Sequence, residues 1–176
     1  MQKHALKLAT ALLGIGIVVA CGSDKVTAPA NIVYVANLRP ANEVLPNGNS
    51  AGVVSPNGTG TWTGTLNPST NVLSWTMTFS GLTTNSIASH IHAQAPATTT
   101  ANVVLNFATF AGSTITLGAP SGTASGSINL ATATVGTGLT ITGDSLRKAI
   151  NAGQAYVNVH SSQYTGGEIR GQIVKQ

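Results

Sequence analysis

The sequence predicts an all-β fold, a Greek-key β-sandwich or flattened barrel with one short helix. Thr, Gly, Val and Ser are abundant and only 7% of the residues are charged, which is typical of strands joined by tight turns. Apolar and hydroxyl side chains alternate along residues 59–66 and 72–80, as in strands with one buried face. Many further short segments of this kind are separated by Gly-rich turns.

The first part of the fold is expected to be a strand followed by a hairpin. Ile32–Leu38 is the first strand candidate, and Thr59–Leu66 and Val72–Ser80 form the hairpin around a turn at Asn67–Asn71. Large apolar side chains take one face of this hairpin and Ser and Thr take the other. We therefore expect a core that includes Trp62, Trp75, Met77, Phe79 and Phe107.

Shorter strands and one helix are expected in the rest of the chain. The helix is predicted at Asp144–Asn151, because Leu146 and Ile150 share an apolar side, Asp144 is placed to cap its start and Gly153 follows its end. The remaining strand candidates are Ile87–His92, Val103–Phe107, Thr114–Leu117, Gly122–Leu130, Ala155–His160 and Glu168–Val174.

The N-terminus is expected to be an export signal and not part of the fold. Lys3 and Lys7 give a positive start, and the uncharged run Leu8–Ala20 fits a signal-peptide core while being short for a membrane span. The run ends at Val18-Val19-Ala20-Cys21, which resembles the lipobox of bacterial lipoproteins. The alternative is an ordinary secretory signal in which the cysteine is incidental.

The lipobox resemblance implies a membrane anchor. In that class the signal (residues 1–20) is cleaved, Cys21 takes a diacylglyceryl group and its amine is acylated, so that several acyl chains hold the protein on the membrane. Residues 21–31 then form a lipidated tether and residues 32–176 one domain. The class marks inner-membrane retention with an aspartate after the cysteine, and Gly22 stands there. We therefore expect the cell envelope, with the outer membrane or cell surface favoured.

Composition excludes several function classes. A hydrophobic content of 42% with little net charge argues against disorder. Removing Lys3 and Lys7 leaves six scattered basic residues against four acidic ones, which is not the clustered pattern of Lys and Arg that nucleic-acid-binding proteins have. Lipidation of Cys21 leaves no thiol for a disulfide or a cysteine-based zinc site. No nucleophile elbow, paired carboxylates or Gly-rich phosphate loop is present, so no catalytic residue is assigned.

Three histidines are the candidate metal ligands. His90 and His92 lie two apart on a predicted strand, so their side chains share a face, and His160 ends another strand. If the two strands are neighbours, three imidazoles converge in a pattern that suits copper or zinc. The alternative is that these are polar surface histidines or that they hydrogen-bond a loop. Alternation places further polar side chains on the same hydrated faces: Tyr156, Asn158, Glu168, Arg170 and Gln172.

Six short motifs, in order along the chain, resemble the CHRD domain, a domain named from chordin and widespread in bacterial secreted proteins. The resemblance covers about residues 32–175 and implies an extracytoplasmic β-sandwich whose biochemical role is largely undefined; in chordin the domain belongs to an extracellular binding protein. The motifs are Ala41-Asn42-Glu43-Val44, Gly60-Thr61-Trp62-Thr63-Gly64-Thr65-Leu66, Leu73-Ser74-Trp75, Ser89-His90-Ile91-His92-Ala93, Tyr156-Val157-Asn158-Val159-His160 and Gly167-Glu168-Ile169-Arg170-Gly171-Gln172.

A more distant resemblance is to copper/zinc superoxide dismutase. A hairpin, the His-x-His pair and a late histidine followed by an arginine strand are similar to that family, which implies His90, His92 and His160 as copper ligands and Arg170 as an anion guide. No histidine lies between His92 and His160, so the bridging imidazole and zinc site of the family have no counterpart. The resemblance leaves a mononuclear copper site or a scaffold without metal.

Three functions remain open from the sequence. The first is a membrane-anchored, non-catalytic binding module with a surface three-histidine site for copper or zinc. In this module Glu168 orients a histidine ligand without binding the metal itself. Its partners are expected to be the membrane, through the anchor, and an extracellular protein or polysaccharide. The second is a mononuclear copper oxidoreductase of the dismutase kind. The third is a structural envelope or adhesion protein with idle histidines.

Overall fold

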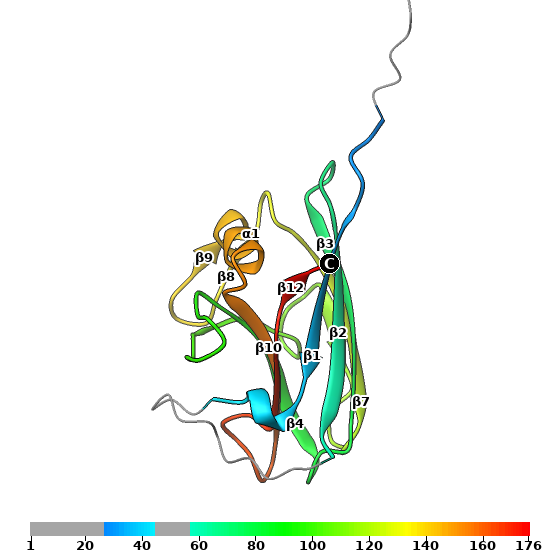
Figure 1. Cartoon of the computed structure of the whole chain (residues 1–176), viewed down its shortest axis with the longest axis vertical. Coiled ribbons are helices and arrows are strands. Elements are labelled where there is room, and N and C mark those ends of the chain that lie inside the picture. Colours follow the sequence, from blue (N-terminus) through cyan, green and yellow to red (C-terminus); the bar gives the residue numbers. More distant parts are fainter. Residues whose placement is uncertain (1–26, 45–56) are drawn as a thin grey trace, which may run out of the picture.

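Two antiparallel sheets packed face to face form the fold (Figure 1). The computed structural model describes residues 27–44 and 57–176. Cys21, the proposed signal and most of the tether lie outside these residues. No helix in the described part of the chain has the length and apolar character needed to cross a membrane.

The larger sheet has six strands. In spatial order these are β12 (Val174–Lys175), β1 (Ile32–Leu38), β2 (Thr59–Asn67), β3 (Val72–Ser80), β7 (Gly122–Asn129) and β6 (Ser113–Ile115). The predicted hairpin is confirmed as β2 and β3, which pair over their full length from Thr59↔Ser80 to Asn67↔Val72.

The smaller sheet carries the histidines. Its order is β11 (Ile169–Gln172), β10 (Ala155–Ser161), β4 (Ser86–Ala93) and β5 (Val103–Asn106). The remaining elements are a two-stranded ribbon of β8 (Thr134–Val135) and β9 (Ile141–Thr142), the helix α1 (Gly143–Asn151) and a short 3-10 helix η1 (Pro40–Asn42). The all-β sandwich with one short α-helix is therefore confirmed.

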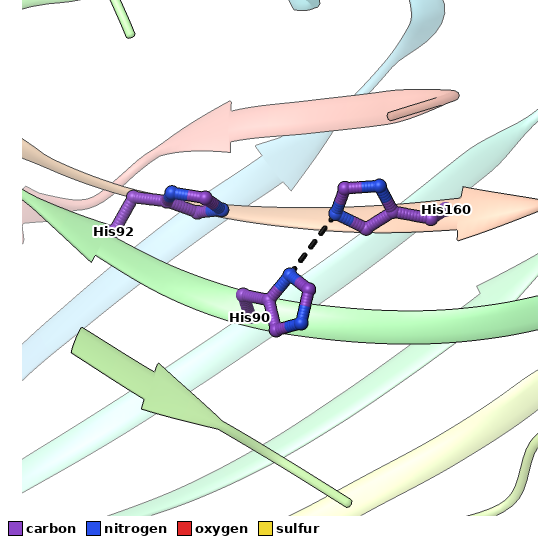
Figure 2. A group of neighbouring side chains, drawn as sticks. All are labelled: His90, His92 and His160. Atoms are coloured by element: carbon purple, nitrogen blue, oxygen red, sulfur yellow. Dashed lines mark hydrogen bonds between the residues drawn. The ribbon is translucent and has the colours of Figure 1, made fainter. Parts of the chain in front are cut away.

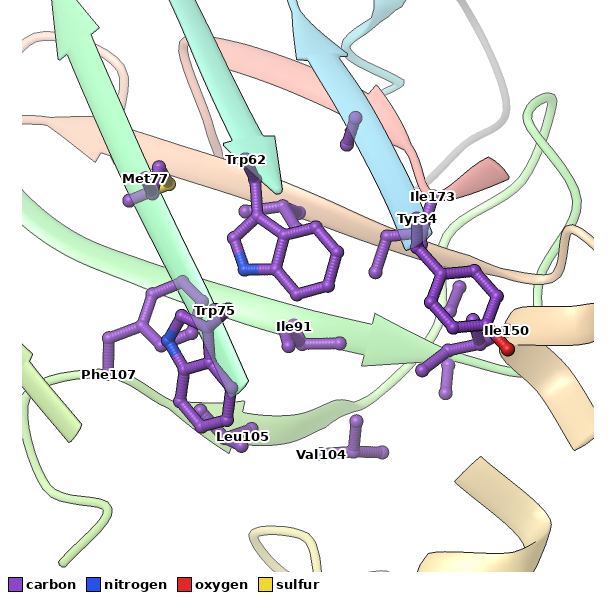
Figure 3. Close-up of a cluster of buried hydrophobic side chains, with 14 of the residues drawn as sticks. Tyr34, Trp62, Trp75, Met77, Ile91, Val104, Leu105, Phe107, Ile150 and Ile173 are labelled. Carbon is purple, nitrogen blue, oxygen red and sulfur yellow. The ribbon is translucent and has the colours of Figure 1, made fainter. Parts of the chain in front are cut away.

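The core fills the space between the two sheets (Figure 3). The predicted core residues Trp62, Trp75, Met77, Phe79 and Phe107 are all buried. The rings of Trp75 and Phe107 pack with centroids 5.8 Å apart, which joins β3 of one sheet to the residue after β5 of the other. Truncating an aromatic residue in such a core costs about 3–5 kcal/mol of unfolding free energy.

One edge of the sandwich is closed by backbone hydrogen bonds. The amide of Arg39 donates to the carbonyl of Arg170 at 2.9 Å, and the reverse bond is 3.2 Å. A Cβ at position 171 would lie 2.7 Å from backbone atoms of Asn37, so only glycine permits this approach. The chain then crosses to the large sheet through the buried Ile173. The single strand predicted at Glu168–Val174 is therefore wrong, because it is split into β11 and β12 at this crossing.

The helix α1 lies where it was predicted but begins differently. Thr142 is its N-cap, with its side-chain oxygen accepting a hydrogen bond from the amide of Ser145 at 3.2 Å. Asp144, the predicted cap, lies instead in the first turn, where it pairs with Arg147 and Lys148. The prediction of Asp144 as the cap was wrong because the threonine two residues earlier already takes that position.

The outer face of the small sheet is polar but largely covered by other segments of the chain, which corrects the prediction of a hydrated face. Asn158 is 2% exposed and Arg170 is 1% exposed. Segments of chain lie over this face and bind its side chains: the carbonyl of Ala101 contacts His92, and that of Thr165 contacts His160. Alternation along the strands predicted which residues share the face, but not that loops would cover them. We use the name polar layer for the polar side chains of this face together with Glu43, which follows η1. The polar layer consists of Glu43, His90, His92, Tyr156, Asn158, His160, Arg170 and Gln172.

Candidate metal centre

Strand register brings the three histidines together. In the ladder between β4 and β10, His90 lies opposite Asn158 and His92 lies opposite Tyr156. His160 follows Asn158 by two residues on the same strand, so its side chain shares that face. The two histidine strands are therefore neighbours, which is the condition that the sequence analysis left open.

The histidine nitrogens converge on a small volume. One nitrogen from each of His90, His92 and His160 lies within 4.8 Å of the other two. Nδ1 of His90 is 3.0 Å from Nε2 of His160 (Figure 2). Metal–nitrogen bonds of about 2.0–2.1 Å in a tetrahedral site place ligand nitrogens about 3.3 Å apart. The observed spacing brackets that value, so small side-chain rotations suffice to hold an ion.

Backbone carbonyls fix the orientation of two of the rings. Nδ1 of His92 donates to the carbonyl of Ala101 at 2.8 Å, and Nδ1 of His160 donates to the carbonyl of Thr165 at 2.9 Å. Because a carbonyl only accepts, Nδ1 carries the hydrogen in each ring and Nε2 of the neutral ring is left with a lone pair. Such outer hydrogen bonds are typical of histidines that ligate metals.

Asn158 is a site residue that the sequence analysis placed on the right face but did not select. Its Oδ1 lies 3.2 Å from Nε2 of His92 and 3.2 Å from Nε2 of His160. Three atoms that accept hydrogen bonds therefore face one another, and the nearest hydrogen is that of His90 Nδ1, which donates to Nε2 of His160 at 3.0 Å. The signal in the sequence was its place in the Tyr156–His160 motif, directly opposite the His-x-His pair.

The electrostatic surroundings keep all three imidazoles neutral. Burial, and then the neighbouring His160 and His92, lower the pKa of His90 to about 3. Burial lowers the pKa of His92 to about 4, against an opposing effect of its bond to Ala101. Burial also lowers the pKa of His160. Neutral imidazole is the form that binds metal ions, so these rings need lose no proton near neutral pH.

The histidine cluster is partly open to solvent. His92 and His160 are buried at 8% exposure each, whereas His90 is only half-buried. The site is thus a covered cluster with one accessible ring, and not the surface site that was predicted. Solvent therefore reaches the cluster from the His90 side.

Glu43 is a second residue of the polar layer that the sequence analysis did not select. It follows η1, is 3% exposed, and its Oε1 accepts a hydrogen bond from the amide of Val44 at 3.1 Å. Burial raises the pKa of Glu43 to about 7, opposed by that bond, by Arg170 and by the amide of Asn158. Gly167, at φ 127°, leaves room for this carboxylate, since a Cβ there would lie 2.3 Å from Oε2.

Glu168 and Arg170 lie at different places around the cluster. Oε1 of Glu168 accepts hydrogen bonds from the amide of Thr83 at 2.6 Å and from its hydroxyl at 2.9 Å. The guanidinium of Arg170 lies over the Tyr156 ring, 3.5 Å from its centroid, and that ring stacks on His92. The roles of Glu168 in orienting a histidine and of Arg170 in guiding an anion stay predictions.

A family model for the CHRD domain matches residues 34–173, from β1 to the crossing after β11. The chain belongs to the CHRD-domain family. The matched range contains every residue of the polar layer, so the histidine cluster is part of the CHRD domain and not of an addition to it. Comparison with curated proteins and with solved structures found no match to the chain. The likeness of this CHRD domain to copper/zinc superoxide dismutase, and its lipoprotein class, stay predictions.

Proposed function

We propose that this CHRD domain is an envelope-anchored, non-catalytic binding module that holds a metal ion. The ligands are Nδ1 of His90, once the hydrogen of that neutral ring has moved to its other nitrogen, Nε2 of His92 and Nε2 of His160. The observation that carries this proposal is the convergence of Nε2 of His92 and Nε2 of His160 on the side-chain oxygen of Asn158, three acceptor atoms with no hydrogen among them, beside Nδ1 of His90. Acceptor atoms that face one another in a covered site are stabilised by a cation.

Copper is the metal that the donor set favours. Imidazole nitrogen binds both copper and zinc, but affinities of nitrogen and oxygen sites for divalent ions peak at Cu²⁺. The described residues around the cluster offer no thiolate, the ligand that most often holds structural zinc. Zinc is therefore the second choice.

The protein's contribution is a fixed set of donors. The carbonyls of Ala101 and Thr165 hold the rings of His92 and His160 in place. The Tyr156 ring stacks on His92 with the ring centroids 4.5 Å apart, which restricts movement of the His92 ring out of its plane. Copper bound here supplies one-electron redox chemistry. The half-exposed His90 side is the specific feature that keeps a dismutase-like oxidoreductase as the alternative function.

The anchor and the partners are part of the same proposal. The lipobox-like end at Cys21 supports attachment to a membrane of the cell envelope, with the outer membrane or cell surface favoured by Gly22. A lipidated tether carries the domain outside the cytoplasm, where an extracellular protein or polysaccharide is the expected partner.

The test is metal content and uptake by the purified full-length protein. Elemental analysis and calorimetric titration are expected to show about one equivalent of copper, lost in His90→Ala and in His160→Ala. Tyr156→Phe is the matched control, because it keeps the ring against His92 and removes only a hydroxyl that accepts from the amide of Ala101. Absence of uptake by the folded wild type would overturn the proposal. A superoxide-consumption assay on the copper-loaded protein then distinguishes a non-catalytic binding module from a dismutase-like oxidoreductase.

A further inference from the structure

A buried guanidinium at the margin of the polar layer is incompletely satisfied. Arg170 is 1% exposed. Its Nη2 donates to the carbonyl of Pro96 at 3.1 Å and to Oε1 of Gln172 at 3.4 Å. Its Nη1 is also buried and has no hydrogen-bond partner in the described part of the chain. A buried N–H of a charged group without a partner is costly, so this atom indicates a missing acceptor.

The charge of Arg170 also lacks a counter-charge in contact. Among the described residues the ion pairs are those of Asp144 with Arg147 and Lys148 on α1, and none involves Arg170. The Glu43 carboxyl acts on Arg170 only from beyond ion-pair distance. Buried charges in proteins are usually paired, and an unpaired one is a candidate binding group.

Arg170 is one of the residues that line a pocket of about 300 Å³. It opens between η1 and the segment after β4. None of the three histidines lines this pocket, so it is distinct from the histidine cluster. Its walls include Asn42, Glu43, Ala97, Thr98, Arg170 and Gln172.

We propose that this pocket binds the carboxylate group of a small organic acid, with the guanidinium of Arg170 donating to one carboxylate oxygen. The positive charge without a contacting carboxylate selects an anion over a neutral acceptor. The hydroxyl of Thr98 in the pocket lining suits the second oxygen, and the small side chain of Ala97 leaves room for a short alkyl group. A dianion is disfavoured because the buried Glu43 carboxyl lies beside the same pocket.

The test is a titration of the metal-free, full-length protein with propionate, its neutral analogue propionamide, and inorganic phosphate. Propionate is expected to bind saturably by calorimetry or NMR, and to bind at least about tenfold more weakly to Arg170→Gln. Propionamide and phosphate are expected to bind much more weakly than propionate. Arg147→Gln on α1 is the matched control, because it removes an exposed guanidinium far from the pocket lining and should leave binding unchanged.

A second variant guards against loss of fold, since Arg170 also packs on Tyr156. Ala97→Phe changes an exposed rim residue, fills the pocket mouth and leaves the guanidinium intact. It is expected to abolish propionate binding. Absence of saturable binding to wild type, as for a pocket that holds only water, would overturn the inference. The inference would also be overturned if Ala97→Phe bound propionate as tightly as the wild type does, or if the wild type bound propionamide as tightly as propionate. Copper uptake by the same preparation is an independent readout, so failure here leaves the metal proposal standing.

Discussion

Oδ1 of Asn158 lies 3.2 Å from Nε2 of His160, although both atoms accept hydrogen bonds. The hydrogen of the His160 ring is on Nδ1, held by the carbonyl of Thr165. The same oxygen faces Nε2 of His92 in the same way. The strand register enforces this meeting, because Asn158 lies opposite His90 in the ladder between β4 and β10, and His160 follows Asn158 by two residues on β10.

Replacing Asn158 tests whether its oxygen helps to hold the ion. Asn158→Leu keeps the shape of the side chain and removes the donor atom, so the affinity for copper is expected to fall about 10- to 100-fold. Asn158→Asp supplies a charged oxygen at the same place and should retain affinity. Competition titration against a chelator of known affinity measures both. An unchanged affinity in Asn158→Leu would limit the ligand set to the three histidines.

Acid is expected to destabilise the metal-free protein. The folded-state pKa of His90 (about 3) and of His92 (about 4) lie below the ordinary value of 6.5. The unfolded chain therefore binds more protons in this window, so the histidine contribution is intact above about pH 6.5 and is lost as pH falls toward 4 and 3. Chemical unfolding measured between about pH 7 and pH 4 checks this. In His160→Gln the unfolding free energy should fall less steeply with decreasing pH than in the wild type. Equal slopes in the two proteins would contradict the assignment of the acid sensitivity to the histidine cluster.

Glu43 is expected to make the stability of the folded protein change with pH in the opposite direction to the histidines. Burial raises the pKa of Glu43 to about 7, so the folded state favours the protonated carboxyl. Its stabilising contribution is complete below its unfolded pKa and is lost as pH rises through about 7. Glu43→Gln should therefore raise the melting temperature relative to wild type more at about pH 8.5 than at about pH 5. Asp144→Asn, at an exposed carboxyl on α1, is the control and should show no such trend in this range.

Gly167 is expected to tolerate no side chain. Its φ of 127° is unfavourable for other residues, and a Cβ would meet Oε2 of Glu43 at 2.3 Å. Gly167→Ala should lower the unfolding free energy by about 1–3 kcal/mol, measured by urea unfolding. Gly166→Ala is the matched control, since a Cβ there meets nothing within 4 Å and the residue has no positive φ. Equal losses in the two variants would refute the packing argument.

Cys21→Ser tests the anchor. If Cys21 is the lipidated residue, the variant should leave the membrane fraction and appear in soluble envelope or culture fractions, because the acyl chains that hold it are gone. Fractionation and detection by antibody measure the change. A variant that stays membrane-bound after its signal is cleaved would contradict the lipoprotein proposal.

The alternating segments were the part of the fold that the sequence could predict. The β2–β3 hairpin, with Trp62 and Met77 in the core, follows from period-two patterning over nine residues in each strand. The ribbon of β8 and β9 was not predicted, because strands of two residues carry no such pattern. The crossing at Ile173 was also missed, since a continuous apolar alternation does not reveal a change of sheet.

The site shows the same division. Alternation placed His90, His92 and His160 on outer faces, and their convergence required only that β4 and β10 pair. The covering loops escaped prediction, because burial of a polar face depends on segments distant in sequence. Asn158 and Glu43 were missed for this reason: an amide or a carboxyl has no marked role until its buried partners are known.

The pairing of β1 with β12 has a consequence for the order in which the protein is assembled. Tyr34 of β1 pairs with Lys175 of β12, so the edge of β1 is completed only by residues that are synthesised long after it. In a chain exported from its N-terminus, His90 and His92 emerge long before His160, and two imidazoles on an unpaired strand hold an ion weakly. Under the proposed export, we therefore expect the cluster to take its metal only after His160 has crossed the membrane, from the metal supply of the compartment outside.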